Sequence, residues 1–234
     1  MSQISVIIPA LNEAGSIGRV VAEMPWQRIA ECIVVDNGST DGTAAIAAGA
    51  GARVVASVRG YGAACKAGSD AALAASEILV FMDGDGSDIV AGLDQLVGPI
   101  ERGERDFVVG SRLRGVREPG SLLPSQVFAG WMVGWLLWIT QRVRYTDMGS
   151  FRAIRRTSLE QLQMSEMTYG WNLEMQVKAC QHGLRIVEIA VDYRRRFAGT
   201  SKVSGDLAAS LRAAVRILHV LLRTGFSRRS KQRQ

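Results

Sequence analysis

Short apolar runs alternate with alanine-rich stretches through the first half of this chain, and no other feature constrains the fold as strongly. Runs rich in valine and isoleucine, bounded by turn residues, are typical of buried strands, whereas the longer alanine-rich stretches are typical of helices. Strands that alternate with helices form a mostly parallel sheet with helices on both faces, so we predict an α/β fold. The predicted strands are Ser5–Pro9, Ile33–Asp36, Val54–Val58, Ile78–Met82 and Phe107–Val109, and the predicted helices cover residues 15–24, 43–50, 62–76 and 89–102.

The composition fits a globular protein with anionic partners. Hydrophobic residues make up 47% of the 234 residues and charged residues 21%, which excludes a disordered, collagen-like or coiled-coil chain. The 28 lysines and arginines outnumber the 22 aspartates and glutamates, and the resulting net charge of +6 favours phosphates, membrane surfaces or nucleic acid as partners. We expect no nucleic acid, because the chain holds no recognised module and no interleaved basic and aromatic segment.

The cysteines and the first residues favour a cytoplasmic protein. Cys32, Cys65 and Cys180 are too widely spaced for a disulfide framework or a zinc site. The chain opens on a strand-like run instead of the cationic start and apolar stretch of a signal peptide. The longest apolar run, Val127 to Ile139, is shorter than the ~20 residues that cross a bilayer as a helix. We therefore expect at most a peripheral association with the inner face of a membrane.

Polar residues follow the first two predicted strands directly. Asn12 and Glu13 follow the first strand, and Asp36 ends the second strand ahead of a glycine-rich turn that contains Ser39. At the carboxyl end of a parallel strand, a carboxylate can accept hydrogen bonds from a base or a ribose, and glycines let the backbone approach the ligand. These loops predict a nucleotide site, although residues 39–41 would equally fit a helix cap.

A second glycine-containing loop, Arg59-Gly60-Tyr61-Gly62, precedes a predicted helix that carries Lys66. Glycines at a helix N-terminus with cations nearby can hold a diphosphate, and an ordinary turn would explain the loop as well. The spacing matches neither GxGxxG nor GxxxxGK[ST], so a dinucleotide dehydrogenase or a P-loop enzyme is disfavoured.

The apolar run Ile78–Met82 leads directly into Asp83-Gly84-Asp85. Residues two apart in an extended chain point the same way, so Asp83 and Asp85 can share one Mg²⁺ or Mn²⁺ ion that bridges a diphosphate. We expect Asp85 to lie in a solvent-facing loop. Asp88 is either a further ligand or a helix cap.

The same segment also resembles haloacid-dehalogenase-type phosphatases, in which Asp83 would be the nucleophile. In those enzymes the motif belongs on the first strand, whereas three predicted strands precede it here. The phosphatase interpretation is therefore the weaker one.

Together these loops resemble the family-2 glycosyltransferases of the GT-A fold. The resemblance implies that Pro9, Glu13 and Asp36 surround the base and ribose of a sugar nucleotide. It also implies that Asp83 and Asp85 hold Mg²⁺ or Mn²⁺ against its diphosphate. Asn12 and Ser39 from the first two loops, and Lys66 from the predicted helix after Gly62, complete the predicted donor site. The resemblance rests on Val6-Ile7-Ile8-Pro9-Ala10-Leu11-Asn12-Glu13, on Val34-Val35-Asp36-Asn37-Gly38-Ser39-Thr40-Asp41-Gly42-Thr43, on Met82-Asp83-Gly84-Asp85 and on Gly110-Ser111-Arg112.

Three later segments, residues 146–153, 169–175 and 193–202, resemble the polyprenyl-phosphate sugar synthases, the dolichyl-phosphate mannose or glucose synthase group. The resemblance implies that Arg112 and the segment from Arg196 to Lys202 lie near the lipid phosphate and the diphosphate. Many members of the group have glutamine where this chain has Ser87. Some members add C-terminal transmembrane helices, which we do not expect here.

The predicted organisation is one GT-A domain over residues 1–205, with a nucleotide-binding half (1–112) and an acceptor half (113–205). An amphipathic helix is expected at 206–226, followed by a basic tail at 227–234 that we expect to be disordered.

Two apolar stripes suggest a surface for lipid. Trp131, Trp135 and Trp138 recur at helical spacing, and tryptophan favours the membrane interface. A second stripe of leucines and Val215, flanked by arginines, lies within 206–226 and could rest on anionic lipid. Core packing or a homodimer seam would explain either stripe equally well.

The resemblance implies transfer with inversion at the anomeric carbon of a hexose, from a donor of the UDP-glucose or GDP-mannose type. A hydroxyl acceptor would need a general base, for which Asp147 and Glu174 are candidates. A lipid phosphate already carries its charge and needs cations instead. The cations that follow the donor motifs favour polyprenyl phosphate over a hydroxyl acceptor, and they are Arg112, Arg194, Arg195, Arg196 and Lys202.

Overall fold

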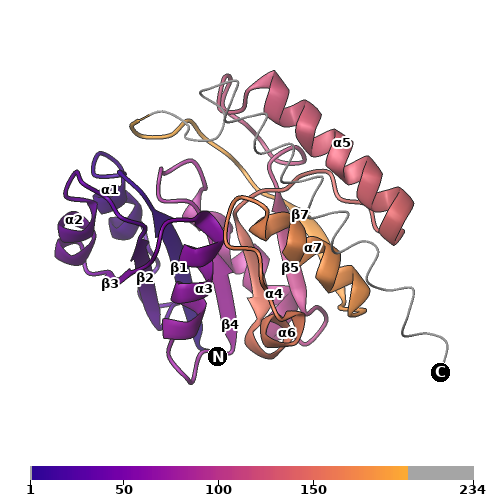
Figure 1. Cartoon of the computed structure of the whole chain (residues 1–234), viewed down its shortest axis with the longest axis horizontal. Coiled ribbons are helices and arrows are strands. Elements are labelled where there is room, and N and C mark those ends of the chain that lie inside the picture. The colour runs from indigo at the N-terminus through magenta and orange to yellow at the C-terminus, as the bar shows by residue number, and fades with distance from the viewer. Residues whose placement is uncertain (1, 200–234) are drawn as a thin grey trace.

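A seven-stranded sheet runs through residues 2–199, the part of the chain that the computed structural model describes (Figure 1). Its strand order is β3-β2-β1-β4-β6-β5-β7. The strands are β1 Ile4–Ala10, β2 Glu31–Asp36, β3 Arg53–Ala56, β4 Ile78–Phe81, β5 Phe107–Ser111, β6 Arg152–Arg155 and β7 Ile186–Ala190. The helices are α1 Ile17–Ala22, α2 Thr43–Gly49, α3 Tyr61–Ala71, α4 Leu93–Glu101, α5 Pro124–Gln141, α6 Arg156–Leu162 and α7 Trp171–Gln181, with a short 3-10 turn at Val90–Gly92.

The five predicted strands and four predicted helices of the first half are confirmed, with shifted ends. The third strand stops at Ala56, two residues early, and Val58 beyond it is 78% exposed. The third helix ends at Ala71 instead of residue 76, and the fourth divides into the 3-10 turn and α4.

The sheet is mostly parallel, as predicted, but β6 runs against its neighbours. β1 pairs in parallel with β2 and β4, and β5 pairs in parallel with β7. β6 is antiparallel to both β4 and β5, so β5 keeps the direction of β4. The sequence reasoning missed β6 because its four residues, Arg-Ala-Ile-Arg, do not form an apolar run.

Alternate side chains of the strands supply two cores, one on each face of the sheet. Ile4, Val6 and Ile8 of β1 face a core shared with α1, α2 and α4, whereas Ile7 faces a core shared with α3, α5, α6 and α7. Burial of each such side chain stabilises the fold by roughly 1.5–3 kcal/mol. The predicted cover of helices on both faces is therefore confirmed.

Helix α5 lies beside α7 at the margin of the fold (Figure 1). Its inner face buries Val133 and Leu137, while its outer face leaves a stripe of large apolar side chains exposed. We call this set the α5 stripe: Phe128, Trp131, Met132, Trp135, Trp138 and Ile139. Within residues 2–199, no helix combines the length and apolar character needed to cross a bilayer.

Because six of the seven strands share one direction, their carboxyl ends meet at one edge of the sheet, which we call the carboxyl edge. The loops after β1, β2, β4 and β5 lie there, as does the chain that enters β6. The predicted helix at 206–226, the basic tail and Lys202 lie outside the described residues.

Candidate active site

The loops after β1 and β2 are joined by hydrogen bonds at the carboxyl edge. The Asn12 backbone N–H donates to Ser39 Oγ at 2.9 Å, and the Thr40 N–H donates to Asn12 Oδ1 at 2.9 Å. Asp36 Oδ1 accepts a hydrogen bond from the Ser39 N–H at 3.0 Å. Asn12 adopts a φ of 51°, in the left-handed region, which brings its amide across to the second loop. Asn12 and Ser39 thus hold the loop in which Asp36 sits at the end of β2.

The alternative role of residues 39–41 as a simple helix cap applies to Asp41. Asp41 Oδ1 accepts from the Thr43 N–H at 3.1 Å, at the start of α2, and Oδ2 accepts from the Ala14 N–H at 3.0 Å. Thr43 Oγ1 in turn accepts from the Glu13 N–H at 2.8 Å. The cap therefore also positions Glu13, which was predicted to face the nucleotide.

Asp85 is buried, contrary to our expectation of a solvent-facing loop. The residue is 7% exposed, with Oδ1 accepting from the Ser87 N–H at 2.8 Å and Oδ2 paired with Arg196 Nη2 at 2.7 Å. The chain that follows β7 covers it, because Phe197 donates its N–H to the Asp85 carbonyl and stacks its ring over Gly86. Asp83 is only partly exposed.

Asp88 connects this loop to another part of the chain by hydrogen bonds. Its Oδ2 accepts from the Asp83 N–H at 3.0 Å and from Ser150 Oγ at 2.9 Å, so it ties the loop to the chain entering β6. Its Oδ1 is enclosed and has no hydrogen-bond partner among the described residues. Burial, together with the neighbouring carboxylates, raises the pKa of both Asp83 and Asp88.

These carboxylates fit a divalent cation. Like charges at Asp83, Asp85 and Asp88 repel one another, and in this structure Arg196, paired with Asp85, and Arg112, near Asp83 and Asp88, supply positive charge. Across residues 2–199 no three His, Cys, Asp or Glu side chains converge on a single ion position. Mg²⁺ is commonly held by one or two carboxylates with the remaining positions filled by water and substrate phosphates. The residues present match that pattern.

The three consecutive arginines after β7 do not form the cation cluster that the sequence suggested. Arg194 Nε donates to the Gly86 carbonyl at 2.6 Å, whereas Arg195 Nε donates to the Pro119 carbonyl at 2.7 Å. Arg196 pairs with Asp85. Successive side chains of an extended segment point in different directions, so each arginine reaches a different loop.

Arg112 and Asp147 form a two-pronged ion pair. Arg112 Nε and Nη2 lie 2.7 Å from Asp147 Oδ2 and Oδ1, and the Arg112 and Met148 N–H groups also donate to this carboxylate. Asp147 is 3% exposed. Burial alone would raise its pKa, but Arg112 outweighs burial and lowers it. The same pairing raises the pKa of Arg112 despite burial.

Glu174, the other candidate base, is also engaged. Its carboxylate accepts from the Ser165 and Glu166 N–H groups at 3.0 and 2.8 Å and pairs with Lys178 Nζ at 2.9 Å. It is 2% exposed, and Lys178 together with these hydrogen bonds lowers its pKa against the effect of burial. These contacts hold the loop that precedes α7.

The loop at Gly60 is filled by protein. The Gly62 and Ala63 N–H groups donate to the carbonyls of Thr168 and Met167 at 3.2 and 2.9 Å. A Cβ at Gly60 would lie 2.3 Å from the Met167 carbonyl oxygen. The glycines thus allow two backbones to approach each other, and the N–H groups expected to face a diphosphate are occupied.

Lys66 is not brought to the carboxyl edge. Its Nζ pairs with Asp70 at 2.6 Å on α3. It lines a hollow with Leu79 and Arg156, near the first residues of β4 and therefore toward the opposite edge of the sheet.

The fold and the carboxyl-edge loops define a glycosyltransferase of the GT-A class. A crystal structure of glucosyl-3-phosphoglycerate synthase from Mycobacterium tuberculosis, in complex with Mn²⁺, UDP-glucose and phosphoglyceric acid, superimposes with a TM-score of 0.74. The match covers 96% of this chain and 80% of that chain at 23% identity. The family model "Glycosyl transferase family 2" matches residues 5–163, and this chain belongs to that family.

Two relatives are similar over nearly the whole chain. An uncharacterized glycosyltransferase of Mycobacterium tuberculosis is 37% identical over 211 residues, covering 89% of this chain and 93% of the relative. The polyprenol monophosphomannose synthase of Mycolicibacterium smegmatis is 31% identical over 229 residues, covering 86% of this chain and 81% of that synthase.

Proposed function

We propose that this family-2 glycosyltransferase moves a hexose, with inversion, from a nucleotide-diphosphate sugar of the UDP-glucose or GDP-mannose type to a polyprenyl phosphate. The observation that carries the acceptor is the engagement of both candidate bases, because Asp147 and Glu174 are buried and charge-paired with lowered pKa values. An acceptor that needs no deprotonation suits such a site. The name of the polyprenol monophosphomannose synthase supports the same acceptor class.

In this proposal, Pro9, Glu13 and Asp36 bind the base and ribose, and Asp83 and Asp85 would hold Mg²⁺ or Mn²⁺. Such an ion, when bound, offsets the negative charge that develops on the leaving diphosphate. Arg196 and Lys202 would contact the diphosphate, and Arg112, held by Asp147, borders the acceptor side. The Mn²⁺ and UDP-glucose in the complex of the structurally similar synthase support both donor and metal.

The chemical step joins an acceptor phosphate oxygen to the anomeric carbon while the bond from that carbon to the diphosphate oxygen breaks. Attack comes from the face opposite the leaving group, so the configuration inverts. A phosphate monoester carries ~1.5–2 negative charges at neutral pH, so no proton has to be removed.

The α5 stripe and the predicted basic helix at 206–226 are proposed to hold the enzyme on the inner face of a membrane, where a polyprenyl phosphate would lie. Tryptophans with one polar and one apolar end favour that interface. A homodimer seam formed by the α5 stripe is the alternative.

A second candidate acceptor is the hydroxyl group of a small molecule. The complex of the structurally similar synthase with phosphoglyceric acid favours it. The phosphatase interpretation is dropped, because the chain belongs to glycosyl transferase family 2.

Mass spectrometry of product mixtures tests the proposal. The purified protein would be incubated with UDP-glucose or GDP-mannose, Mn²⁺, and either farnesyl phosphate or farnesol. We expect a glycosylated farnesyl phosphate, and Asp147→Asn and Glu174→Gln variants that remain folded should keep part of the rate. Loss of a true general base would lower the rate ~10²–10⁴-fold. A fall of that size in a folded variant, together with a glycosylated farnesol as product, would contradict the proposal.

A further inference from the structure

A glutamate faces inward on β7, the strand at one end of the sheet. Glu188 lies between Val187 and Ile189 and is in register with Val109 of β5. Val187 and Ile189 pack against the core on one face of the sheet, whereas Ile186 packs against the core on the other. Because side chains alternate along a strand, Glu188 points to the same face as Ile186. Its side chain is 7% exposed, and the sequence reasoning did not single it out.

The Glu188 carboxylate holds the backbone of the segment that enters β6. Its Oε1 accepts from the Thr146 N–H at 2.8 Å and from the Asp147 N–H at 3.2 Å. Within residues 2–199, no backbone carbonyl accepts from either of these N–H groups. Burial raises the pKa of Glu188, although these hydrogen bonds and the nearby Arg114 act in the opposite direction. The carboxylate therefore supplies the acceptor that a neighbouring strand would otherwise provide.

The Thr146 hydroxyl extends this contact to the end of β5. It donates to Glu188 Oε2 at 2.9 Å and lies 2.6 Å from Ser111 Oγ. Because its single proton is given to Glu188, Thr146 Oγ1 accepts from the Ser111 hydroxyl. Ser111 is fully buried as the last residue of β5, and Arg112 follows it directly. Glu188 thus joins the segment that carries Asp147 to the strand end that carries Arg112.

The ion pair of Arg112 and Asp147 depends on the distance between these two segments. Asp147 Oδ2 accepts from the Arg112 backbone N–H at 3.0 Å and from Nε at 2.7 Å, while Oδ1 accepts from Nη2 at 2.7 Å. Hydrogen bonds weaken steeply when their distances and angles change, so a two-pronged pair requires that both backbones stay in place. A guanidinium that is already held in one orientation need not be ordered when an anionic ligand binds.

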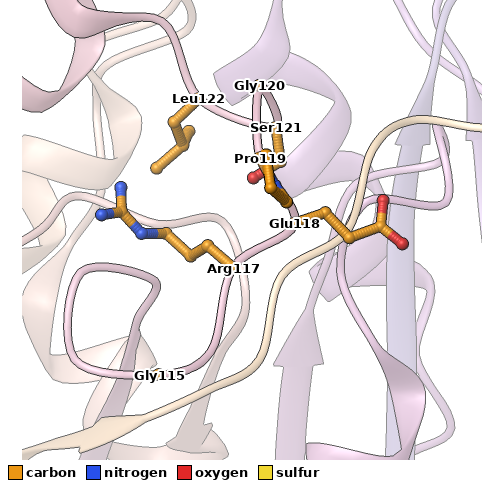
Figure 2. Close-up of a pocket in the computed structure, with 7 residues that line it drawn as sticks. All are labelled: Gly115, Arg117, Glu118, Pro119, Gly120, Ser121 and Leu122. Atoms are coloured by element: carbon orange, nitrogen blue, oxygen red, sulfur yellow. The ribbon is translucent and has the colours of Figure 1, made fainter.

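A second carboxylate, Glu118, lies in the connection between β5 and α5, and it is engaged elsewhere. The Arg114 guanidinium of this connection donates to the Glu188 carbonyl at 2.6 Å. The next residues, Gly115 and 117–122, line a hollow of about 380 Å³ (Figure 2). Glu118 points away from Arg117 (Figure 2), and its Oε2 accepts from the Arg195 N–H at 2.7 Å. Glu188, and not Glu118, therefore joins the start of this connection to the segment that enters β6.

We propose that Glu188 is a positioning residue for sugar transfer, which holds residues 146–147 against the end of β5 and so keeps the Arg112 guanidinium in one orientation toward the acceptor. The inference rests on the proposed function, in which Arg112 borders the acceptor side. Glu188 acts through its hydrogen bonds, because its ion pair with Arg114 is long, at 3.9 Å. It does not itself touch the substrate, since protein encloses its carboxylate.

Two substitutions separate the hydrogen bonds of Glu188 from its charge. Glu188→Gln removes the charge but keeps an acceptor oxygen at the same reach, whereas Glu188→Asp keeps the charge but withdraws it by one methylene. The matched control is Glu31→Asp, because Glu31 is also a buried strand carboxylate. It accepts from the Leu73 N–H at 2.6 Å and the Ser5 hydroxyl at 2.7 Å, and it begins β2 at the opposite edge of the sheet. Thermal melting compares stabilities, and Thr146→Val is the milder variant if Glu188→Asp does not fold.

The first readout is the Arg112 Nε–H signal in a nitrogen–proton NMR correlation spectrum of the whole protein, identified by its loss in Arg112→Lys. An N–H that is hydrogen-bonded inside the fold exchanges slowly with water, so the wild type should show the signal. Glu188→Gln and Glu31→Asp should keep it, and Glu188→Asp should shift or broaden it. A wild type without the signal, or a folded Glu188→Asp with an unchanged signal, would overturn the proposal.

The second readout is the steady-state kinetics of transfer, with the acceptor that mass spectrometry identifies. Glu188→Asp should raise the Michaelis constant for this acceptor about 10- to 100-fold, because Arg112 loses its fixed position. The donor's Michaelis constant should change less than about twofold, because Glu188 bonds to none of the described donor-site residues. Glu188→Gln should restore most of the acceptor's value. A merely structural role would lower the melting temperatures of Glu188→Asp and Glu31→Asp alike without this split, and that result would overturn the proposal.

The two proposals fail in different ways. Transfer to the hydroxyl of farnesol would remove the proposed acceptor, whereas the Arg112 signal and the kinetics with farnesol would still test the positioning by Glu188. Conversely, transfer to farnesyl phosphate with an unchanged Michaelis constant for that acceptor in a folded Glu188→Asp would retain the proposed function and remove the positioning role.

Discussion

Asp147 and Glu174 show how burial and pairing decide which carboxylates remain available for chemistry. Both were candidates for a general base, since each lies in a segment that resembles a transferase motif. In the structure each accepts several hydrogen bonds and lies beside a cation. A carboxylate whose pKa is lowered in this way is a weak proton acceptor, which is why we favour an acceptor that is already ionised.

Asp85→Ala should abolish metal-dependent transfer and also lower stability. The side chain accepts two hydrogen bonds from Ser87 and balances Arg196, so its loss should cost about 1–3 kcal/mol of unfolding free energy. Urea unfolding and transfer assays with added Mn²⁺ would measure the two effects. Full wild-type activity in EDTA would contradict the metal role of this residue.

Asp147→Asn should destabilise the protein by about 3–5 kcal/mol at pH 7, because it leaves Arg112, whose side chain is only 15% exposed, without its partner. The pKa of Asp147 is lower in the folded than in the unfolded state, so its contribution to stability is present above the ordinary value near 4. That contribution is lost as the pH falls further, through the folded-state pKa. The difference in unfolding free energy between wild type and variant should therefore shrink below about pH 4 in urea titrations. A pH-independent difference would refute the linkage.

At the scale of elements, the glycine-containing loops after β2 and at Gly60 have similar sequences but different roles. The turn after β2 stays open at the carboxyl edge, whereas the Gly60 loop receives the chain that precedes α7. Both contain glycines before a helix. The Gly60 loop differs because residues 166–168, far away in the sequence, pack against its backbone, so it forms a contact between two backbones and not a ligand-binding loop.

Gly62→Ala should strongly destabilise the contact between α3 and the loop before α7. A Cβ at this position would lie 2.2 Å from the Glu166 carbonyl oxygen, which is backbone and cannot rotate away. Overpacking of this kind typically costs about 1–3 kcal/mol. Gly49→Ala on α2 is the control, since a Cβ there meets nothing within 4 Å. Equal melting temperatures for the two variants would show that the loop shifts freely.

The α5 stripe should contribute to binding of vesicles that contain anionic lipid. Trp131 and Trp135 are 63% and 52% exposed, so replacing both with serine should leave the melting temperature unchanged. Loss of their apolar surface should weaken vesicle binding at least about tenfold, since burial of one large apolar side chain is worth roughly 1.5–3 kcal/mol. Cosedimentation would measure binding, with the exposed Trp26→Ser as control. Unchanged sedimentation together with a shift from dimer to monomer would instead identify a subunit interface.

At the scale of the whole molecule, one edge of one sheet gathers the loops of both halves of the chain. The antiparallel β6 makes this arrangement work, because its entering segment delivers Asp147 and Ser150 to the edge where the parallel strands end. The segment after β7 then crosses the same edge and covers Asp85. The division into a nucleotide-binding half and an acceptor half at residue 112 remains a prediction.

A donor nucleotide with its metal should therefore stabilise the fold as a unit. We expect UDP or GDP together with Mn²⁺ to raise the melting temperature more than either component alone. At a concentration 100 times its dissociation constant, a ligand adds about 2.7 kcal/mol to the unfolding free energy. Calorimetric scans would detect the shift, and Asp36→Ala should reduce it. Equal shifts with the nucleotide in EDTA and in Mn²⁺ would contradict shared binding of donor and metal.

The sequence by itself determined the parallel first half, the helices on both faces and the positions of Asp36, Asp83 and Asp85 at strand ends. These features depend on periodicity and turn residues within short windows, so local pattern is sufficient to find them. The tertiary structure decided the direction of β6, the burial of Asp85 and the separation of Lys66 from the carboxyl edge. Each of these depends on groups far apart in the chain, such as Arg196 and Asp85, which are 111 residues apart. Only the closed fold brings such groups within hydrogen-bonding distance and removes the water that would otherwise screen their charges.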